Sequence, residues 1–207
     1  MVRVKVCGIT NLEDASRVLS ARCDALGFVF YKKSPRYIRP PAARKIIKAL
    51  PRRVLKIGVF VNAKEKEIRR IAKLCCLDML QFHGNESVGF CFRFTGYKII
   101  KAFRIKEKID LPKIFKYNTY AYLFDTFTND KFGGTGKKFN WGLLKDIKDI
   151  KKPVFLSGGL TAVNVRDALK LAHPAWVDVS SSVEISPGKK DHKKVKEFIQ
   201  AVKNSAL

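Results

Sequence analysis

Six short stretches of this sequence carry side chains suited to acid–base or anion-binding chemistry. They are Cys7, Arg36, His83, Asp125, the run Ser157-Gly158-Gly159, and the run from Asp178 to Ser181. Taken alone, each has an ordinary structural explanation, as a small buried residue, a surface cation or a turn residue. They share one property, because each stands at or just after the end of a strand-length apolar segment. A fold that gathers these ends would turn isolated residues into one site.

Strand-like and helix-like segments alternate along the chain, at intervals of roughly 25 residues. The expected strands cover residues 3–7, 24–30, 53–61, 77–82, 97–103, 119–124, 153–156 and 176–179. Of the eight expected helices, three follow capping residues, at Thr10 or Asn11, at Asn62 and at Asn140, and one begins at Pro40. The other four cover residues 86–94, 111–116, 161–171 and 191–202. A long loop, 126–138, contains Gly133-Gly134-Thr135-Gly136 and has the length of a lid.

Eight apolar strands, each followed by an amphipathic helix, indicate parallel strands joined by helical crossovers. The sequence therefore predicts an α/β fold, a single-domain (β/α)8 TIM barrel over residues 1–207, near the short end of the ~200 to 400 residues usual for that fold. The alternative is an open doubly wound sheet, which needs no pairing of the first and last strands. In a barrel, the carboxyl ends of all strands meet on one face, where the six stretches would become neighbours.

Two of these stretches are suited to hold an anion. Gly158-Gly159 separates the seventh strand from its helix, and glycines let backbone N–H groups approach an anion closely. Ser180-Ser181 follow the eighth strand and add hydroxyl and amide donors. Loops after strands seven and eight are the recurrent phosphate site of barrels, so we predict Gly158, Gly159, Ser180 and Ser181 as phosphate-binding residues.

The chain has a formal net charge of +24, from 42 Lys and Arg against 18 Asp and Glu. Such a field attracts anions of any kind, from phosphorylated metabolites to nucleic acid. The basic residues are spread through every segment and are typical of solvated helix faces, rather than of a basic arm. We therefore expect a small phosphorylated substrate and no nucleic-acid partner.

The five cysteines form an odd set without metal-ligand spacing, which predicts neither a disulfide framework nor a metal site. The longest apolar runs are only strand-length, and residues 1–5 lack the apolar segment of a signal peptide. These features favour a soluble cytoplasmic protein without membrane contact. A barrel of this size is expected to be a monomer or a homodimer.

Seven motifs stand in order from the first strand to the last helix. They are Lys5-Val6-Cys7-Gly8-Ile9-Thr10, Gly27-Phe28-Val29-Phe30 with Ser34-Pro35-Arg36-Tyr37, Gln81-Phe82-His83-Gly84, Gly133-Gly134-Thr135-Gly136 with Phe139-Asn140-Trp141, Leu156-Ser157-Gly158-Gly159-Leu160, Val177-Asp178-Val179-Ser180-Ser181 and Pro187-Gly188-Lys189-Lys190-Asp191. Together they resemble the phosphoribosylanthranilate isomerase family of tryptophan biosynthesis. Seven ordered motifs are far more specific than any one of them.

The resemblance implies an Amadori rearrangement, which converts N-(5-phosphoribosyl)anthranilate to its 1-deoxyribulose form without a metal or cofactor. By the same resemblance, Asp125 matches the general acid that protonates the furanose ring oxygen, and Cys7 matches the general base that removes the C2 proton. Arg36 matches the residue that contacts the anthranilate side of the substrate. His83, just after the fourth strand, and Asp178, in the eighth, complete the predicted substrate-binding residues.

This chemistry sets requirements on the two catalytic groups. The acid needs a raised pKa or a rapid return of its proton, and the apolar run Tyr122-Leu123-Phe124 before Asp125 favours the first. The base must be available unprotonated, and a thiolate is favoured before a helix N-terminus in a positive site. The sequence thus predicts that Cys7 loses its proton readily.

Three residues depart from the family's pattern, namely Ser182 for glycine, Asn140 for aspartate and Phe82 for leucine. Ser182 is the change most able to restrict the approach of the backbone to a phosphate.

The rival enzyme is a histidine-pathway isomerase barrel, whose first strand ends on aspartate, and Cys7 argues against it. The chain also lacks a convincing twofold repeat. Two further interpretations are a basic nucleic-acid-associated protein and an inactive barrel, and intact Cys7 and Asp125 argue against the latter.

Overall fold

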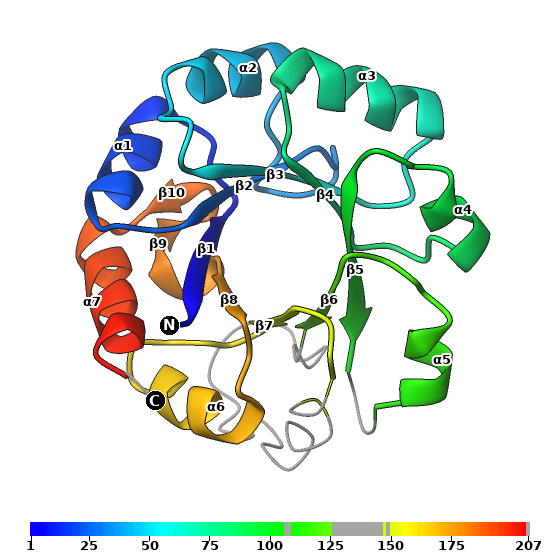
Figure 1. Ribbon diagram of the computed structural model, residues 1–207. Helices are drawn as coiled ribbons and strands as arrows, with labels where there is room; N and C mark the ends of the chain where they lie inside the picture. The colour runs from blue at the N-terminus through cyan, green and yellow to red at the C-terminus, as the bar shows by residue number, and fades with distance from the viewer. Residues whose placement is uncertain (106–108, 126–146, 148–149, 206–207) are drawn as a thin grey trace.

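The computed structural model describes residues 1–105, 109–125, 147 and 150–205. Within these residues, eight parallel strands close into a barrel in sequence order, with the helices around the outside (Figure 1). The closing pair joins the first and eighth strands, where Val4 is in register with Val177 and Val6 with Val179. This pairing confirms the predicted barrel and excludes the open sheet.

The strands are β1 (Arg3–Cys7), β2 (Ala25–Val29), β3 (Leu55–Phe60), β4 (Met79–Phe82), β5 (Lys98–Arg104), β6 (Ala121–Asp125), β7 (Val154–Ser157) and β8 (Trp176–Val179). The helices are α1 (Leu12–Ser20), α2 (Pro40–Lys48), α3 (Glu65–Cys75), α4 (Val88–Phe92), α5 (Leu111–Phe115), α6 (Val165–Ala172) and α7 (His192–Lys203). A 3₁₀ turn, η2 (Ser181–Val183), leads into an antiparallel ribbon of β9 (Glu184–Ser186) and β10 (Lys189–Lys190), which the sequence analysis did not predict.

Apolar side chains cover both faces of the barrel strands. One buried cluster draws on seven of the eight strands, and in it Phe155 and Trp176 stack with ring centroids 4.9 Å apart. A larger cluster packs the strands against the surrounding helices. In that cluster the rings of Phe82 and Phe94 pack edge-on, with their centroids 5.0 Å apart. Burial on both faces explains why the strands are nearly continuous apolar runs in the sequence.

Helix starts follow local side-chain chemistry, with two departures from prediction. Asn11 caps α1 by accepting a hydrogen bond from the Asp14 N–H, as expected. Asn62 does not cap α3, because its backbone is left-handed, with φ of 50°, and its side chain accepts from the Asn85 N–H instead. The sixth described helix begins at Val165 rather than at 161.

The remaining boundaries differ from prediction by one or a few residues. The helix predicted over 86–94 is shortened to α4, where Ser87 serves as the cap. The strand predicted over 119–124 begins at Ala121 and includes Asp125. The predicted lid at 126–138 and the helix capped by Asn140 lie outside the described residues. Within the part of the chain that is described, no helix has the length and apolar character to cross a bilayer.

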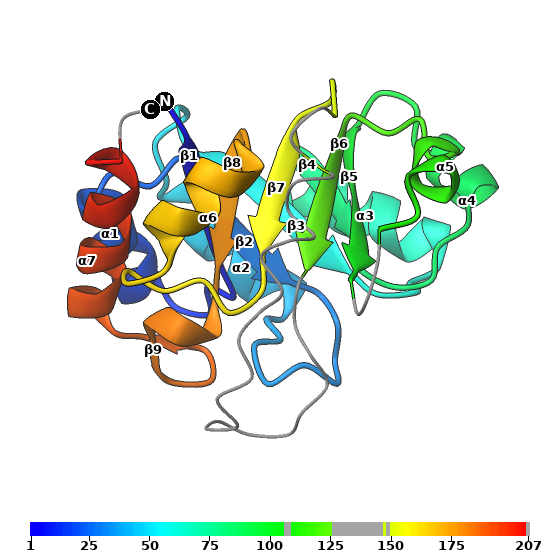
Figure 2. The ribbon, with the colours of Figure 1, turned by 90° about the horizontal axis from the view of Figure 1, so that it is seen from below.

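The strands all point their carboxyl ends toward the same side of the molecule. Figure 2 shows this side carrying the loop between β2 and α2 and the start of the β9 ribbon, while the N-terminus and the carboxyl end of α7 lie on the opposite side. This end of the barrel is where the predicted functional residues should meet.

Close packing between β1 and β2 should be sensitive to one methyl group. A Cβ at Gly27 would lie 2.7 Å from Cys7 Sγ and 3.0 Å from Cys7 Cα. We expect Gly27→Ala to lower the free energy of unfolding by about 1–3 kcal/mol, because β1 must shift. Gly89→Ala in α4 is the matched control, since its Cβ would meet no atom within 4 Å, and it should be neutral or stabilising by up to about 1 kcal/mol. Urea unfolding measures both, and a wild-type stability for Gly27→Ala would contradict this packing.

Candidate functional site

A pocket of about 200 Å³ lies at the carboxyl end of the barrel. It joins members of four of the predicted stretches. Its lining includes Arg36, Asp125, Ser157, Gly158, Gly159, Asp178, Ser180 and Ser181, together with Ser182. Among the described residues, Cys7 and His83 stand outside this lining, but each is bonded to a residue within it. Closure of the barrel therefore brings the predicted residues together.

His83 reaches the pocket through Asp125. Its Nε2 lies 3.1 Å from Asp125 Oδ2, and its Nδ1 lies 2.9 Å from Gln81 Nε2. An amide nitrogen only donates, so His83 Nδ1 accepts, and a neutral ring carries its proton on Nε2, pointing at Asp125. Both side chains of the His83–Asp125 pair are about four-fifths buried. The arrangement holds the carboxyl group in one orientation at the end of β6.

A buried ion pair lies inside the barrel beside Cys7. Lys5 Nζ donates to Asp178 Oδ2 at 2.7 Å, and the two side chains are 0% and 5% exposed. Burial lowers the pKa of Lys5, but the charges of Asp178 and Cys7 outweigh this effect and raise it. Burial also raises the pKa of Asp178, against the opposing charge of Lys5. Within the described part of the chain, Asp178 Oδ1 is buried without a hydrogen-bond partner.

The Cys7 thiol is buried at the end of β1, with 9% exposure. Burial raises the pKa of this thiol, and the positive charges of Lys5 and Lys190 oppose the rise without reversing it. The prediction that Cys7 loses its proton readily is therefore wrong for the protein as it stands. The physical reason is that the sequence revealed the neighbouring positive charges but not the depth of burial.

The two glycines after β7 have left-handed backbones, with φ of 93° at Gly158 and 63° at Gly159. Asn164 holds the next turn, accepting from the Thr161 N–H at 2.8 Å and donating to the Gly159 carbonyl at 3.0 Å. This turn delays the start of α6 to Val165. The glycine loop itself, rather than the first turn of a helix, therefore forms the wall of the pocket.

The serine residues after β8 use their hydroxyl groups to tie loops together. Ser180 Oγ donates to the Cys7 carbonyl at 3.1 Å. Ser182 Oγ donates to the Leu160 carbonyl and so joins the glycine loop to η2. The hydroxyl of Ser182, a position where the sequence resemblance led us to expect glycine, is thus bonded to backbone at the wall of the pocket.

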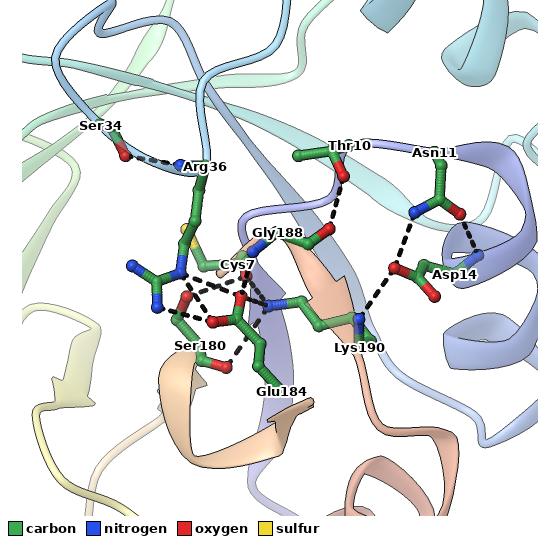
Figure 3. Close-up of polar contacts among 10 residues, drawn as sticks. All are labelled: Cys7, Thr10, Asn11, Asp14, Ser34, Arg36, Ser180, Glu184, Gly188 and Lys190. Carbon is green, nitrogen blue, oxygen red and sulfur yellow. Dashed lines mark hydrogen bonds and ion pairs between the residues drawn. The ribbon is translucent and has the colours of Figure 1, made fainter. Parts of the chain in front are cut away.

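Arg36 is held by residues that the sequence analysis did not single out. Its guanidinium pairs with Glu184, with Nη2 at 2.6 Å from Oε2. Lys190 Nζ donates to Glu184 Oε1 at 2.7 Å and to the Cys7 carbonyl at 2.6 Å (Figure 3). The network therefore connects the loop after β2 to the end of β1 through the β9–β10 ribbon.

Comparison with known proteins places this chain in a family. A family model described as N-(5'-phosphoribosyl)anthranilate (PRA) isomerase matches residues 4–201. The chain belongs to this family. The match confirms the predicted resemblance over nearly the whole sequence.

Individual relatives of the phosphoribosylanthranilate isomerase family agree with this assignment. The enzyme of that name from Thermotoga neapolitana is 47% identical over 204 residues, covering 98% of this chain and 99% of that protein. The crystal structure of phosphoribosyl anthranilate isomerase from Thermotoga maritima has a TM-score of 0.92 at 44% identity, and covers 99% of this chain and 100% of its own.

Two further structures, both 41% identical, cover the same shares of the two chains. One, with a TM-score of 0.89, is a complex with reduced 1-(o-carboxyphenylamino)-1-deoxyribulose 5-phosphate. The other, with a TM-score of 0.88, is described as monomers of the dimeric Thermotoga maritima enzyme.

Sequence reasoning missed several buried charged and amide residues of this isomerase fold, among them Lys5, Gln81, Lys101, Glu184 and Lys190. Strand alternation was the one available signal, because Lys5 and Gln81 stand two residues before Cys7 and His83 and so share their face. Lys190 and Glu184 lie on a ribbon too short to show any periodicity. Among the described residues, no group of three or more His, Cys, Asp or Glu side chains is placed to hold a metal ion.

Replacing one partner of the Lys5–Asp178 pair should destabilise the folded protein more than replacing both. We expect Lys5→Met to lower the free energy of unfolding by about 3–5 kcal/mol, since a buried carboxylate loses its cation. The double variant Lys5→Met/Asp178→Asn should recover a large part of that loss, because it buries no charge. Urea unfolding near neutral pH tests this, and equal stability of the single and double variants would show that the two charges are not coupled.

Proposed function

We propose that this chain catalyses the Amadori rearrangement of N-(5-phosphoribosyl)anthranilate to 1-(2-carboxyphenylamino)-1-deoxyribulose 5-phosphate in tryptophan biosynthesis. The observation that carries the proposal is the match of one family model to residues 4–201. It is supported by a pocket that joins a carboxyl group, a glycine loop and an arginine. The strongly positive chain favours a substrate with a phosphate and a carboxylate.

In this proposal the substrate phosphate binds at Gly158, Gly159, Ser180 and Ser181. The left-handed glycines form the kind of backbone concavity that presents N–H groups to an anion. Asp178 is proposed to bind the sugar through its unpartnered oxygen, which among the described residues accepts no other hydrogen bond. Arg36, which lines the same pocket, is proposed to bind the anthranilate carboxylate as a planar, bidentate donor.

Asp125 acts as the general acid in the first step. It donates a proton to the furanose ring oxygen while the C1–O bond breaks, and the nitrogen lone pair forms the C1=N bond of a protonated Schiff base. His83 is hydrogen-bonded to the same carboxyl group and orients it. His83 thereby also provides a path along which the proton of Asp125 can be replaced.

Cys7 acts as the general base in the second step. It removes the proton from C2, and the electrons of that bond form the C1=C2 bond of an enolamine as the positive charge on nitrogen is neutralised. The enolamine then becomes the ketone when C1 gains a proton and the C2 hydroxyl loses one. Lys5 and Lys190 help by stabilising the thiolate that burial disfavours.

We further propose a cytoplasmic monomer or homodimer that acts on this small molecule without a nucleic-acid partner. The dimeric state is included because the Thermotoga maritima relative is described as dimeric.

Turnover of N-(5-phosphoribosyl)anthranilate, generated in situ and followed by anthranilate fluorescence, tests the function and both roles. We expect the wild type to be active and Cys7→Ala and Asp125→Asn each to lose about 10²–10⁴ in kcat, or more, as for a positioned acid or base. Cys76→Ala, which removes an exposed thiol at the end of α3, is the matched control and should keep wild-type activity. An inactive, folded wild type would refute the function, while a fully active Cys7→Ala would refute only the role of the thiol.

The raised pKa of Cys7 predicts the direction of the pH profile. Since kcat/KM reports groups of the free enzyme, and only the deprotonated thiol is the base, kcat/KM should rise with pH through the ordinary thiol range near 8.5. Steady-state assays between about pH 6 and about pH 9 measure this limb. A plateau already reached below about pH 7 would mean that Cys7 is deprotonated more easily than its burial indicates.

A further inference from the structure

Arg36 lines the pocket but is not free to turn. Its Nε donates to both carboxylate oxygens of Glu184, at 2.9 and 3.0 Å, and its Nη2 donates to Oε2 at 2.6 Å. The Arg36 side chain is 22% exposed and that of Glu184 only 4%. An arginine with one edge fixed by a buried carboxylate has a defined orientation, in contrast to a solvated one.

Glu184 is itself fixed. Lys190, fully buried, donates to its Oε1 at 2.7 Å, and the Gly188 N–H donates to the same oxygen at 3.3 Å. Burial would raise the pKa of Glu184, but hydrogen bonds from Arg36 and Lys190 outweigh it and lower the pKa. Glu184 is therefore a carboxylate at neutral pH. Lys190 fixes its position, and Glu184 in turn fixes the guanidinium of Arg36.

The pairing uses only one edge of the guanidinium. Nε and Nη2 of Arg36 turn toward Glu184, and Nη1 points away from that carboxylate (Figure 3). Among the described residues, Nη1 makes no hydrogen bond. The outer edge, with Nη1 and the second N–H of Nη2, has the fork geometry that matches a planar carboxylate.

We propose that Glu184 is a positioning residue, which presents the outer edge of Arg36 to the carboxylate of an aromatic substrate and so sets the preference for a carboxylated ring. The inference rests on the proposed function and adds the residue that determines this part of its specificity. Lys190 supports the role by donating to Glu184 Oε1 and so fixing the carboxylate that holds Arg36. Glu184 touches no substrate and acts only through Arg36.

The test compares two substrates, N-(5-phosphoribosyl)anthranilate and N-(5-phosphoribosyl)aniline, which lacks the carboxylate. Wild type should prefer the first in kcat/KM. Glu184→Gln should lower kcat/KM for the anthranilate substrate by about tenfold or more, mainly through KM, and leave the aniline substrate within about threefold. Arg36→Met should remove the preference, and Glu184→Gln should add no further loss in that background.

A second pair of variants separates positioning from simple structural support. Asp14→Asn is the matched control, because Asp14 accepts the Lys190 N–H at 2.9 Å and so anchors the same ribbon without contacting Arg36. It should leave the ratio of the two kcat/KM values unchanged. Arg36→Lys keeps the charge but not the fork, and should lose most of the preference even when Glu184 is intact.

Three outcomes would overturn the proposal while the function stands. They are an equal loss on both substrates in Glu184→Gln, the same change of ratio in Asp14→Asn, and a full preference in Arg36→Lys. A folded wild type that turns over neither substrate would instead refute the proposed function, and this inference with it.

Discussion

The arrangement of this molecule depends on the pairing of β1 with β8. An eighth parallel strand that pairs with the first leaves no free sheet edge in the described barrel, and it fixes which residues face one another across the seam. Lys5 is in register with Asp178 there, so an inward-facing lysine meets an inward-facing carboxylate. The ion pair places charge inside an otherwise apolar barrel, next to the thiol that ends β1. Closure thus sets both the shape of the barrel and the electrostatics around Cys7.

Two buried lysines influence that thiol from different directions. Lys5 lies two residues earlier on the same strand, and Lys190 reaches the Cys7 carbonyl from the ribbon after η2. Each is paired with one carboxylate, Asp178 or Glu184 respectively, so neither burial leaves a charge uncompensated. Their combined effect opposes the desolvation of the thiol without overcoming it. A buried neutral thiol is protected from chance reactions, and it needs a stabilising environment only when it gives up its proton, as the proposed role of Cys7 requires.

The β9–β10 ribbon links parts of the site that are far apart in sequence. Through Glu184 it holds Arg36, and through Lys190 it holds the end of β1. Asp14 at the start of α1 anchors the backbone of the same ribbon. Since a hydrogen-bonded network of buried charges has few alternative arrangements, the loops at this end of the barrel are positioned by specific contacts rather than by general packing.

The sequence by itself determined the barrel and most of the pocket. Strands buried on both faces must be apolar, and glycines and capping residues mark their ends, so alternation, order and resemblance sufficed to place Asp125, the Gly158-Gly159 loop and Asp178 at one face. Only the tertiary structure decided that Cys7 is buried enough to raise its pKa, that Asn62 bonds across to Asn85, and that Arg36 is held by Glu184. These outcomes depend on desolvation and on partners as many as 183 residues apart, and a pattern along the chain carries neither distance nor burial.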